Sequence, residues 1–444
     1  MTVDAEKQDT TLTVSPYEEG SSASNSVDGL PKDEQSPPEI NTAALEVPDG
    51  GLVAWMQVSG SFLLFTNSWG ILNSFGVFET YYVSINLSGK SSSQIAWIGS
   101  LQAFLLLIVG IFSGPFFDLG FFRPLMLTGS IIVVLGLVFT SLCKEYWQLI
   151  LAQGILTGIG CGLFFVPSVA IVPQYFDKKR ALALGIAASG SSVGGVIYPI
   201  IFHKLHAKIG FGWSIRVIAL IVLVTQTYVV AIMRTRVKQP RKRVKASKSV
   251  IVYPPFLAFV GFGFFGFMGV YIPFFYMEGF SLLKGIFDAD MSFYTLAIMN
   301  AASTFGRLLP NALADKIGPF NVLVPCLVAT SVLMFCWIPA TDKAGVILIS
   351  ILYGFFSGSI ISLSAPCMSV MTPDIAILGT RMGVLFAISS LGLLVGTPVA
   401  GQLLKTHLQF EAPALFGGSV LILSAILLTV SRLLYTGPVL MAKA

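Results

Sequence analysis

Long apolar stretches separated by short polar breaks occupy the chain from about residue 52 to residue 435. A membrane-spanning helix takes about 20 predominantly apolar residues, so each such stretch is a candidate span. The pattern predicts twelve spans, near residues 52–78, 94–114, 124–142, 147–172, 181–203, 212–233, 251–276, 291–314, 321–340, 344–371, 380–403 and 413–435. We find no strand signals and therefore expect an all-α polytopic membrane protein.

Composition supports this interpretation. Hydrophobic residues make up 55% of the 444 residues and charged residues 11%, whereas soluble domains carry about 25% charged residues. The five cysteines form no C-x-x-C pair, and the three histidines, His203, His206 and His407, all lie near span ends. His203 and His206 have a spacing that suits a metal, but histidines in a solvated loop are the simpler explanation. We expect no enzyme activity, no cofactor and no bound metal.

Three stretches fall outside the spans. Residues 1–47 are acidic and rich in Ser and Pro, which predicts a disordered cytosolic tail. Residues 234–250 carry eight of the 27 Lys and Arg and no acidic residue. Alone this run resembles a nucleic-acid patch, but its place between two hydrophobic halves indicates a cytosolic linker facing anionic lipid, with no nucleic-acid partner. Residues 436–444 form a short C-terminal tail.

Loop charges predict the orientation. With the N-terminus inside, most loop Lys and Arg fall on the cytosolic side, together with both termini and the linker. The plasma membrane is the expected location, with the vacuolar or another internal membrane as the alternative. Asn86 begins an Asn-Leu-Ser sequence on the outer side, where it is a candidate glycosylation site.

An internal repeat divides the spans into two sets of six. Residues in the first half recur in the second about 199 positions later. The pairs are Pro167 with Pro366, Pro199 with Pro398, Arg180 with Arg381, and Asp118 with Asp315. Equivalent helix kinks in both halves are expected of a duplication. We expect pseudo-symmetric six-helix bundles at 48–233 and 251–435, around a central cavity.

Two short loops occupy matching places in these halves. They read Gly-Pro-Phe-Phe-Asp-Leu-Gly-Phe-Phe-Arg at 114–123 and Asn-Ala-Leu-Ala-Asp-Lys-Ile-Gly at 311–318. Both resemble the loop motif of the major facilitator superfamily, whose acidic and basic residues form a latch of the inner gate. The resemblance assigns gating to Asp118, Arg123, Asp315 and Lys316, and implies a transporter fold of twelve helices. The alternative is that any short loop carries a charge or two.

Two further motifs narrow the resemblance. Pro-Asp-Gly-Gly at 48–51, and the stretch from Tyr175 to Gly190 that includes Arg180, are similar to signatures of the monocarboxylate transporter family, especially its fungal branch. The resemblance covers the chain from about residue 48 and implies two halves that rock about a midplane site. We expect Asp49 to be structural, as an acid at a helix N-terminus. Arg180 and its basic neighbours have either a gating role or serve only as positive charge on the inner side.

Arg307 is the outstanding charge within a span. It shares a helix face with Asn300 and Ser303, and it matches the eighth-helix arginine that, in the family, helps to hold an anionic substrate group. An arginine that reaches the surface from the last two helix turns is the alternative.

The chain departs from the family at two positions. Asn73 stands where animal members have a lysine, and Asn300 where they have an acidic residue. We expect no carboxylate clearly within a span, which speaks against proton-coupled transport of the lactate type. Polar residues that could line the cavity are Asn67, Asn73, Gln102, Tyr198, Tyr271 and Tyr276, although each alone serves equally as an interhelical contact.

These features predict a secondary transporter that moves a small organic solute, a monocarboxylate or a polar aromatic metabolite, by alternating access. The expected substrate site comprises Arg307, Asn300, Ser303, Asn73, Asn67 and Tyr276. One alternative is an efflux transporter for a fungal secondary metabolite, and another is a non-transporting membrane sensor. Proton antiporters of the drug type have an arginine where Gly154 stands here, which argues against that branch.

Overall fold

The computed structural model describes residues 48–83, 87, 89–236, 253–372, 375–407 and 410–438. These residues belong to one compact helical unit. The tail at 1–47, Asn86, and the linker from residue 237 onward lie outside the described residues, so the predictions made for them remain predictions.

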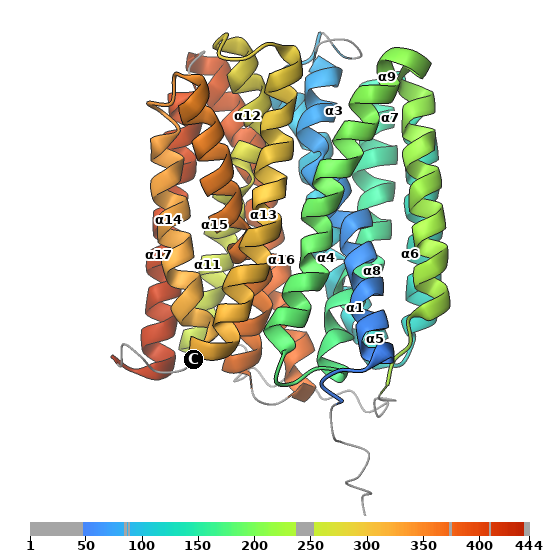
Figure 1. Ribbon diagram of the computed structural model, residues 1–444, viewed down its shortest axis with the longest axis vertical. Helices are drawn as coiled ribbons and strands as arrows, with labels where there is room; N and C mark the ends of the chain where they lie inside the picture. Colours follow the sequence, from blue (N-terminus) through green and yellow to red (C-terminus); the bar gives the residue numbers. More distant parts are fainter. Residues whose placement is uncertain are drawn as a thin grey trace, which may run out of the picture. The chain divides into compact units, whose positions relative to one another are not determined.

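The helices follow the predicted spans closely (Figure 1). Their bounds are α1 Leu52–Phe65, η2 Thr66–Gly70, α2 Ile71–Asn73, α3 Phe75–Tyr81, α4 Ser92–Ile108, α5 Gly110–Asp118, α6 Phe122–Thr140, α7 Tyr146–Leu149, η4 Ile150–Thr157, α8 Gly158–Ala170, η5 Val172–Gln174, α9 Arg180–Ile232, α11 Pro254–Val270, α12 Ile272–Leu283, α13 Ala289–Ile317, α14 Pro319–Cys336, α15 Lys343–Met371, α16 Ile375–His407 and α17 Glu411–Thr436. Within the described chain, nine helices are long and apolar enough to cross a membrane.

Twelve spans are predicted, so three more crossings need an explanation. They come from the second part of α9, from the run of short helices α1 to α3, and from α13. α9 turns back at Gly210, whose φ of 76° is left-handed and suits glycine, so this one element crosses twice. The first crossing, from α1 to α3, is interrupted, and α13 carries more polar residues than its neighbours. Each of the twelve predicted spans therefore corresponds to a helical crossing. The chain enters α1 and leaves α17 at the same end, here called the terminal end (Figure 1).

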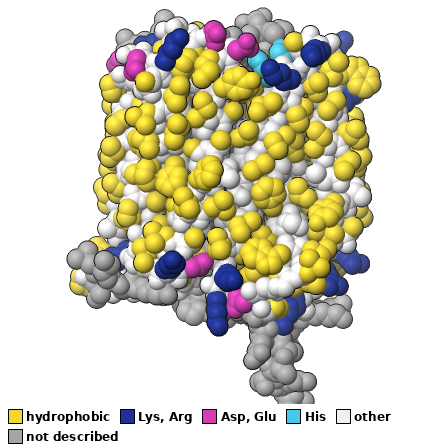
Figure 2. Space-filling model, viewed as in Figure 1, with side chains coloured by type: hydrophobic (Ala, Val, Ile, Leu, Met, Phe, Trp, Pro, Cys, Tyr) yellow, Lys and Arg dark blue, Asp and Glu magenta, His cyan; other side chains and the backbone are white. Residues whose placement is uncertain are grey.

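The surface has the polarity that a lipid environment requires. On the face that Figure 2 shows, apolar side chains cover the middle, Lys, Arg, Asp and Glu lie along both edges, and His lies along the upper edge. Large apolar residues such as Phe112 and Leu220 are 64% and 59% exposed, whereas serines such as Ser350 and Ser357 are buried. Water would disfavour so broad an apolar surface. In a bilayer an exposed apolar surface has no such cost. Helices there associate through close packing and hydrogen bonds of small polar residues such as serine.

Helices of the first half pack against helices of the second (Figure 1). α9 lies along α13, and α4 lies along α16. At the end opposite the terminal end, Ser93 Oγ donates to the Pro398 carbonyl at 3.1 Å, and the Ser100 and Thr397 hydroxyls are 2.6 Å apart. The division into bundles at 48–233 and 251–435 remains a prediction, because the described helices form one unit.

The first crossing of each half is broken at a corresponding place. The helix from Leu52 contains a π-helical segment at Thr66–Gly70 and breaks at Ser74, and the helix from Pro254 breaks at Tyr271, before Pro273. Proline removes a backbone donor, and π-helical turns leave carbonyls less regularly bonded. Paired discontinuous helices are a feature of midplane binding sites in transporters. These two breaks are therefore where a substrate site is expected.

Candidate functional site

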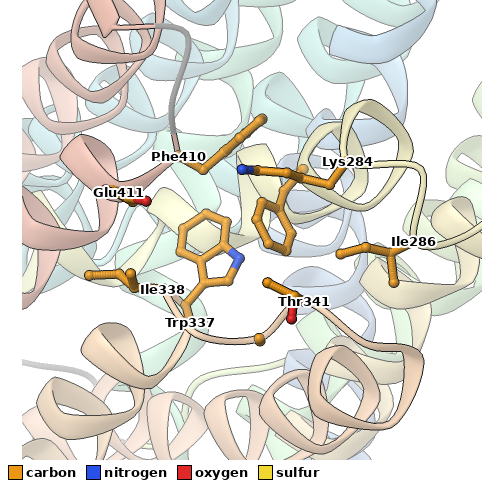
Figure 3. Close-up of a pocket in the computed structure, with 9 residues that line it drawn as sticks. Lys284, Ile286, Trp337, Ile338, Thr341, Phe410 and Glu411 are labelled. Carbon is orange, nitrogen blue, oxygen red and sulfur yellow. The ribbon is translucent and has the colours of Figure 1, made fainter.

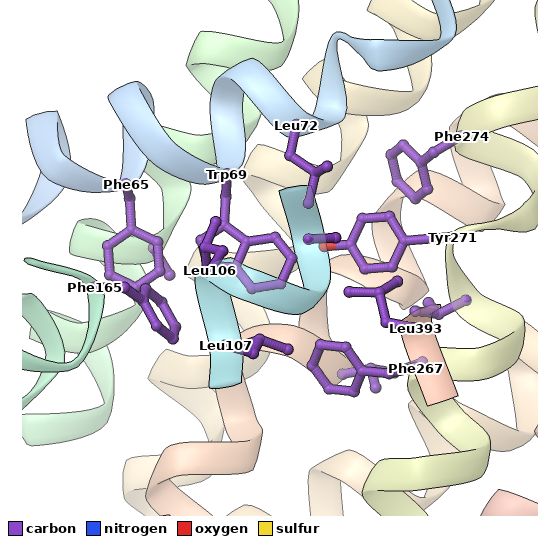
Figure 4. Close-up of a cluster of buried hydrophobic side chains, with 14 of the residues drawn as sticks. Phe65, Trp69, Leu72, Leu106, Leu107, Phe165, Phe267, Tyr271, Phe274 and Leu393 are labelled. Carbon is purple, nitrogen blue, oxygen red and sulfur yellow. The ribbon is translucent and has the colours of Figure 1, made fainter. Parts of the chain in front are cut away.

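The two breaks bring Trp69 and Tyr271 face to face. Their rings stack with centroids 5.7 Å apart and an angle of 22° between planes, and Phe165 and Phe267 pack on the indole (Figure 4). Both Trp69 and Tyr271 are 1% exposed. Trp69 Nε1 and the Tyr271 hydroxyl have no hydrogen-bond partner among the described residues. Because buried polar atoms are nearly always paired, these two donors make the aromatic pair a candidate for contact with a polar ligand.

Arg307 lies on α13 near this aromatic pair and is 1% exposed. Its Nε donates to Ser303 Oγ at 3.3 Å, and its Nη1 donates to the carbonyl of Ala188 in the other half at 3.2 Å. The guanidinium and the Tyr271 phenol are close enough to interact electrostatically. In the described chain the carboxylate ion pairs involve Arg180 and His203, not Arg307. A buried cation without a carboxylate is costly, and an anionic ligand would relieve that cost.

Asn300 and Asn73 each present an unpaired acceptor. Asn300 Nδ2 donates to the Leu296 carbonyl at 3.1 Å, and Asn73 Nδ2 donates to the Ser191 carbonyl at 3.4 Å. Both amide oxygens are buried, with no partner among the described residues. Sequence reasoning named both asparagines, Arg307 and Tyr271, but it missed Trp69, because a tryptophan in an apolar span gives no signal of the break beside it.

Asn67 and Tyr276, the other predicted binding residues, have their polar groups paired inside the protein. Asn67 Nδ2 donates to Thr225 Oγ1 at 2.8 Å, and its Oδ1 accepts from the Tyr198 hydroxyl at 2.6 Å. The Tyr276 hydroxyl donates to the Thr397 carbonyl at 2.8 Å. Both residues therefore join helices, whereas the amide oxygens of Asn300 and Asn73 have no partner among the described residues.

A carboxylate links the two halves at the terminal end. Asp315, in the last turns of α13, accepts from the backbone N–H of Ala181 at 3.2 Å and of Leu182 at 3.1 Å. These are orphan donors of the first turn of α9, where the helix dipole also favours a negative charge. The carboxylate of Asp315 thus acts on the N-terminus of a helix in the other half.

The other predicted gating residues, as far as the structure describes them, form no hydrogen bond or ion pair between the two halves. Arg180 pairs with Asp177 on its own segment at 2.9 Å, and Arg123 and Lys316 are exposed. The side chain of Asp118 lies outside the described residues.

Replacing Asp315 by alanine is expected to loosen the terminal end. The lost contacts with the N-terminus of α9 are worth about 1 kcal/mol, or about fivefold in an equilibrium. Ser189 lies on α9 about two turns beyond Ala181 and is buried, so its labelling reports opening of this end. In a background without native cysteines, maleimide should label Ser189→Cys about three to five times faster when Asp315→Ala is added. Asp342→Ala, an exposed carboxylate at the opposite end, should leave the labelling rate unchanged. An equal rate in the Asp315 variant would contradict the assignment.

Asp49 does not cap its own helix, contrary to the expectation. Helix α1 has Gly51 at its N-cap and no acidic residue in its first turn. Instead Asp49 Oδ1 accepts from the backbone N–H of Asp177 at 2.6 Å and of Lys178 at 2.8 Å, and the N–H of Asp49 donates to the Tyr175 carbonyl. The Pro-Asp-Gly-Gly motif therefore ties the start of α1 to the loop before α9.

The Asp49 contact is expected to make stability depend on pH. Burial by itself raises the pKa of this carboxyl, but hydrogen bonds from the N–H groups of Asp177, Lys178 and Lys179 and the charge of Lys178 lower it, and the net pKa lies below its ordinary value. The stabilisation is thus present above the ordinary pKa and is lost as pH falls through the lowered one.

The measurement is thermal melting of the purified protein from about pH 7 to about pH 3. Asp49→Asn should be less stable by up to about 1 kcal/mol at neutral pH and should converge with the unchanged protein in acid. A constant difference across the range would contradict the titration of Asp49.

Two carboxylates correct the expectation that spans hold none. Glu79 in α3 and Glu278 in α12 are 5% and 7% exposed. The helices extend past the predicted span ends at residues 78 and 276, to Tyr81 and Leu283. The prediction was wrong because, in a hydrophobicity pattern, a glutamate buried inside a helix looks the same as a glutamate that ends an apolar run.

His203 and His206 do not form a metal site with a third ligand, since the described residues contain no cluster of three metal-binding side chains. His203 Nε2 lies 3.1 Å from Asp290 Oδ1 across the two halves, and its ring stacks on Phe293 at 4.3 Å. The histidine therefore contributes to contact between α9 and α13.

A pocket of about 190 Å³ opens at the end opposite the terminal end (Figure 3). Its wall includes Trp337 and Phe410, with Lys284 and Glu411 at the mouth. All of its lining residues belong to the second half of the chain. A site that alternates between two faces must lie between the halves, so we place the candidate site at Trp69, Tyr271 and Arg307 instead.

Comparison with known proteins identifies the family. The model of the Major Facilitator Superfamily matches residues 52–376 and 295–439. The chain is 46% identical to the MFS-type transporter dbaD of Emericella nidulans, over 87% of this chain and 88% of the relative. It is 38% identical to the aspyridones efflux protein of the same fungus, over 86% and 78%. It is also 37% identical to the agnestins efflux protein of Paecilomyces divaricatus, over 91% and 95%.

Solved structures agree at the level of the fold. The human organic anion transporter MFSD10 superposes with a TM-score of 0.64 at 15% identity, covering 85% of this chain and 98% of that one. The E. coli fucose:proton symporter FucP gives a TM-score of 0.63 at 15% identity, with the same coverage. The family match, the curated relatives and the helical arrangement lead to one conclusion: the chain belongs to the major facilitator superfamily and is a multi-pass secondary transporter, not an enzyme.

Proposed function

We propose that this transporter exports an organic anion with an aromatic or otherwise flat, polar body. The observation that carries the proposal is the position of Arg307. It is buried beside the Trp69–Tyr271 stack and has no carboxylate partner among the residues that the structure describes. A carboxylate or phenolate would take the guanidinium as counter-ion. The aromatic faces suit a flat ring, and the open Tyr271 hydroxyl and Trp69 Nε1 suit its polar substituents.

Other residues would adjust the fit of the substrate. Ser303 orients the Arg307 side chain, while the amide oxygens of Asn73 and Asn300 would accept from hydroxyl groups. Asn67 and Tyr276 would support the cavity wall through the helices they join. The resulting preference is for a multifunctional metabolite over a very small acid.

The relatives support export over uptake. Two relatives are named as efflux proteins, one for aspyridones and one for agnestins, and both align with most of this chain. The interpretation as an exporter of a fungal secondary metabolite is thus better supported than uptake of a simple monocarboxylate. The finer resemblance to monocarboxylate transporters is compatible with it, because the shared feature is an arginine that holds an anionic group.

Alternating access would run between the two ends of the interface. We place the terminal end in the cytosol, the side that collects most loop Lys and Arg, and the opposite end outside, with the plasma membrane as the expected location. Asp315 would help to close the inner end, with Arg180, Asp118, Arg123 and Lys316 in supporting gating roles. The Ser93–Pro398 and Ser100–Thr397 contacts would close the outer end.

The test is transport of a panel of solutes in inside-out vesicles that contain the full chain. The panel pairs aromatic carboxylic acids with their amides and adds small monocarboxylates. ATP-independent accumulation of the aromatic acids, with little transport of the amides, is expected. Preferential transport of small acids would favour the monocarboxylate alternative, and failure of every solute to move would favour a non-transporting sensor.

A further inference from the structure

Two buried carboxyl groups lie on helices that face each other at the outer end of the interface. Glu79 lies on α3 in the first half and Glu278 on α12 in the second, and these helices pack against each other. The backbones approach closely there, since a Cβ atom on Gly76 would lie 2.7 Å from the Phe274 carbonyl oxygen. The two carboxyls are close enough to repel each other electrostatically. Oε2 of each is buried and has no hydrogen-bond partner among the described residues.

The pair is also related by the internal repeat. Glu79 and Glu278 are 199 positions apart, the same separation as Pro167 and Pro366. Each glutamate lies in the short helix that follows the break in the first crossing of its half. The pair therefore sits where the outer segments must separate for the cavity to open outward.

Among the described residues, neither glutamate forms an ion pair with a cation. The Thr80 hydroxyl is hydrogen-bonded to the Glu278 carboxyl, and the Tyr276 phenol acts electrostatically on Glu79 while donating to Thr397. α11 and α4 carry no charged residue, and the side chain of Lys405 on α16 lies outside the described residues. On the other packed elements, Lys284, Asp288, Asp290 and Glu411 are exposed. His203 and His206 of α9 are half-buried, with the His206 ring against Tyr81 of α3. Arg307 of α13 is buried, but its electrostatic partner is Tyr271 rather than either glutamate.

Two ionised carboxylates at this depth would repel each other in a medium of low dielectric constant. A single proton shared between them converts the repulsion into an O–H···O⁻ hydrogen bond and provides the partner that both Oε2 atoms lack. Loss of that proton to external water restores two negative charges on opposite halves, which drives the halves apart.

We propose that Glu79 and Glu278 form a proton-binding latch, in which one shared proton holds the outer end closed and its release opens it. The inference rests on the alternating-access cycle proposed above, but it does not depend on which solute is carried. The outward-open state then becomes more populated as external pH rises, and protonation returns the transporter to its closed form.

The experiment measures the outer gate directly, without solute, in full-length protein in lipid nanodiscs. Native cysteines are replaced, and spin labels are attached at Lys208→Cys and Lys284→Cys, two exposed positions at the outer end of opposite halves. Distances between labels are recorded by electron resonance from about pH 5 to about pH 8. In this protein with both glutamates intact, the population at the longer distance should rise about tenfold across this range.

Glu79→Gln and Glu278→Gln each place an amide donor against the remaining carboxylate and should keep the gate closed at every pH. The matched control Glu411→Gln removes an exposed carboxylate at the same end and should retain the full pH response. Absence of a pH response with both glutamates intact, or an unaltered response in both latch variants, would overturn the proposal.

A second measurement requires no label. Infrared difference spectra between acid and alkaline buffer should contain the carbonyl band of a protonated carboxyl group, and this band should be lost in Glu79→Gln and Glu278→Gln but kept in Glu411→Gln. A band that persists in the first two variants would contradict the shared proton. Because neither readout uses transport, failure of the latch and failure of the proposed substrate class are distinguishable.

Discussion

Replacing Arg307 by alanine is expected to lower transport of anionic solutes by about 100-fold, which corresponds to roughly 3 kcal/mol of lost anion binding. The physical reason is that Arg307 is 1% exposed and has no carboxylate partner in the described chain, so its full charge is available to a ligand. Transport of aromatic acids in inside-out vesicles measures the loss, with the protein level in the membrane determined in the same samples.

Three comparisons separate charge from shape at this position. Arg307→Lys keeps the charge but loses the planar fork that contacts Ser303 and Ala188, so an intermediate loss is expected. The amide counterpart of each acid should be transported poorly and almost equally by the unchanged protein and Arg307→Ala. Lys208→Ala, at an exposed outer position, should transport normally. Undiminished transport of an acid by Arg307→Ala would remove Arg307 from the binding site.

Replacing Gly306 by alanine is expected to destabilise the transporter as strongly as many core substitutions. A Cβ atom on Gly306 would collide with the backbone carbonyl of Phe355, because α13 and α15 touch at this point without an intervening side chain. A carbonyl in a helix cannot move aside as a flexible side chain does, so the two helices must separate. Overpacking of this kind costs about 1–3 kcal/mol, and it also displaces the neighbouring Arg307.

Gly383→Ala is the matched control for this substitution. Gly383 also lies within a helix, α16, but an added Cβ there has no atom within 4 Å. Alanine should leave stability unchanged or raise it by up to about 1 kcal/mol through helix propensity. Thermal melting and size-exclusion profiles in detergent measure both variants. Equal stability of Gly306→Ala and Gly383→Ala would show that the contact between α13 and α15 is not close-packed.

The binding residues themselves illustrate what a sequence pattern reaches. Arg307 stands out because a charged side chain within an apolar run is rare. Asn73 and Asn300 stand out because they are polar, although burying a neutral amide costs less free energy than burying a charge. Trp69 could not be recognised, because its importance comes from the π-helical turn at Thr66–Gly70 and from the stacking partner Tyr271, about 200 positions away. Asn67 matched the pattern of a binding residue, yet its amide bonds to Tyr198 and Thr225.

The sequence alone determined that the chain is an all-helical membrane protein with twelve crossings and an internal repeat. These properties depend on the polarity of successive residues against a bilayer of set thickness, which is a local relation. Only the tertiary structure decided which polar groups lie together across the halves: Asp315 contacts the start of α9, Arg307 contacts Ala188, and Glu79 lies near enough to Glu278 to act on it electrostatically. Those contacts depend on where helices break and on which way side chains point. The spacing of apolar residues along the sequence carries no information on either.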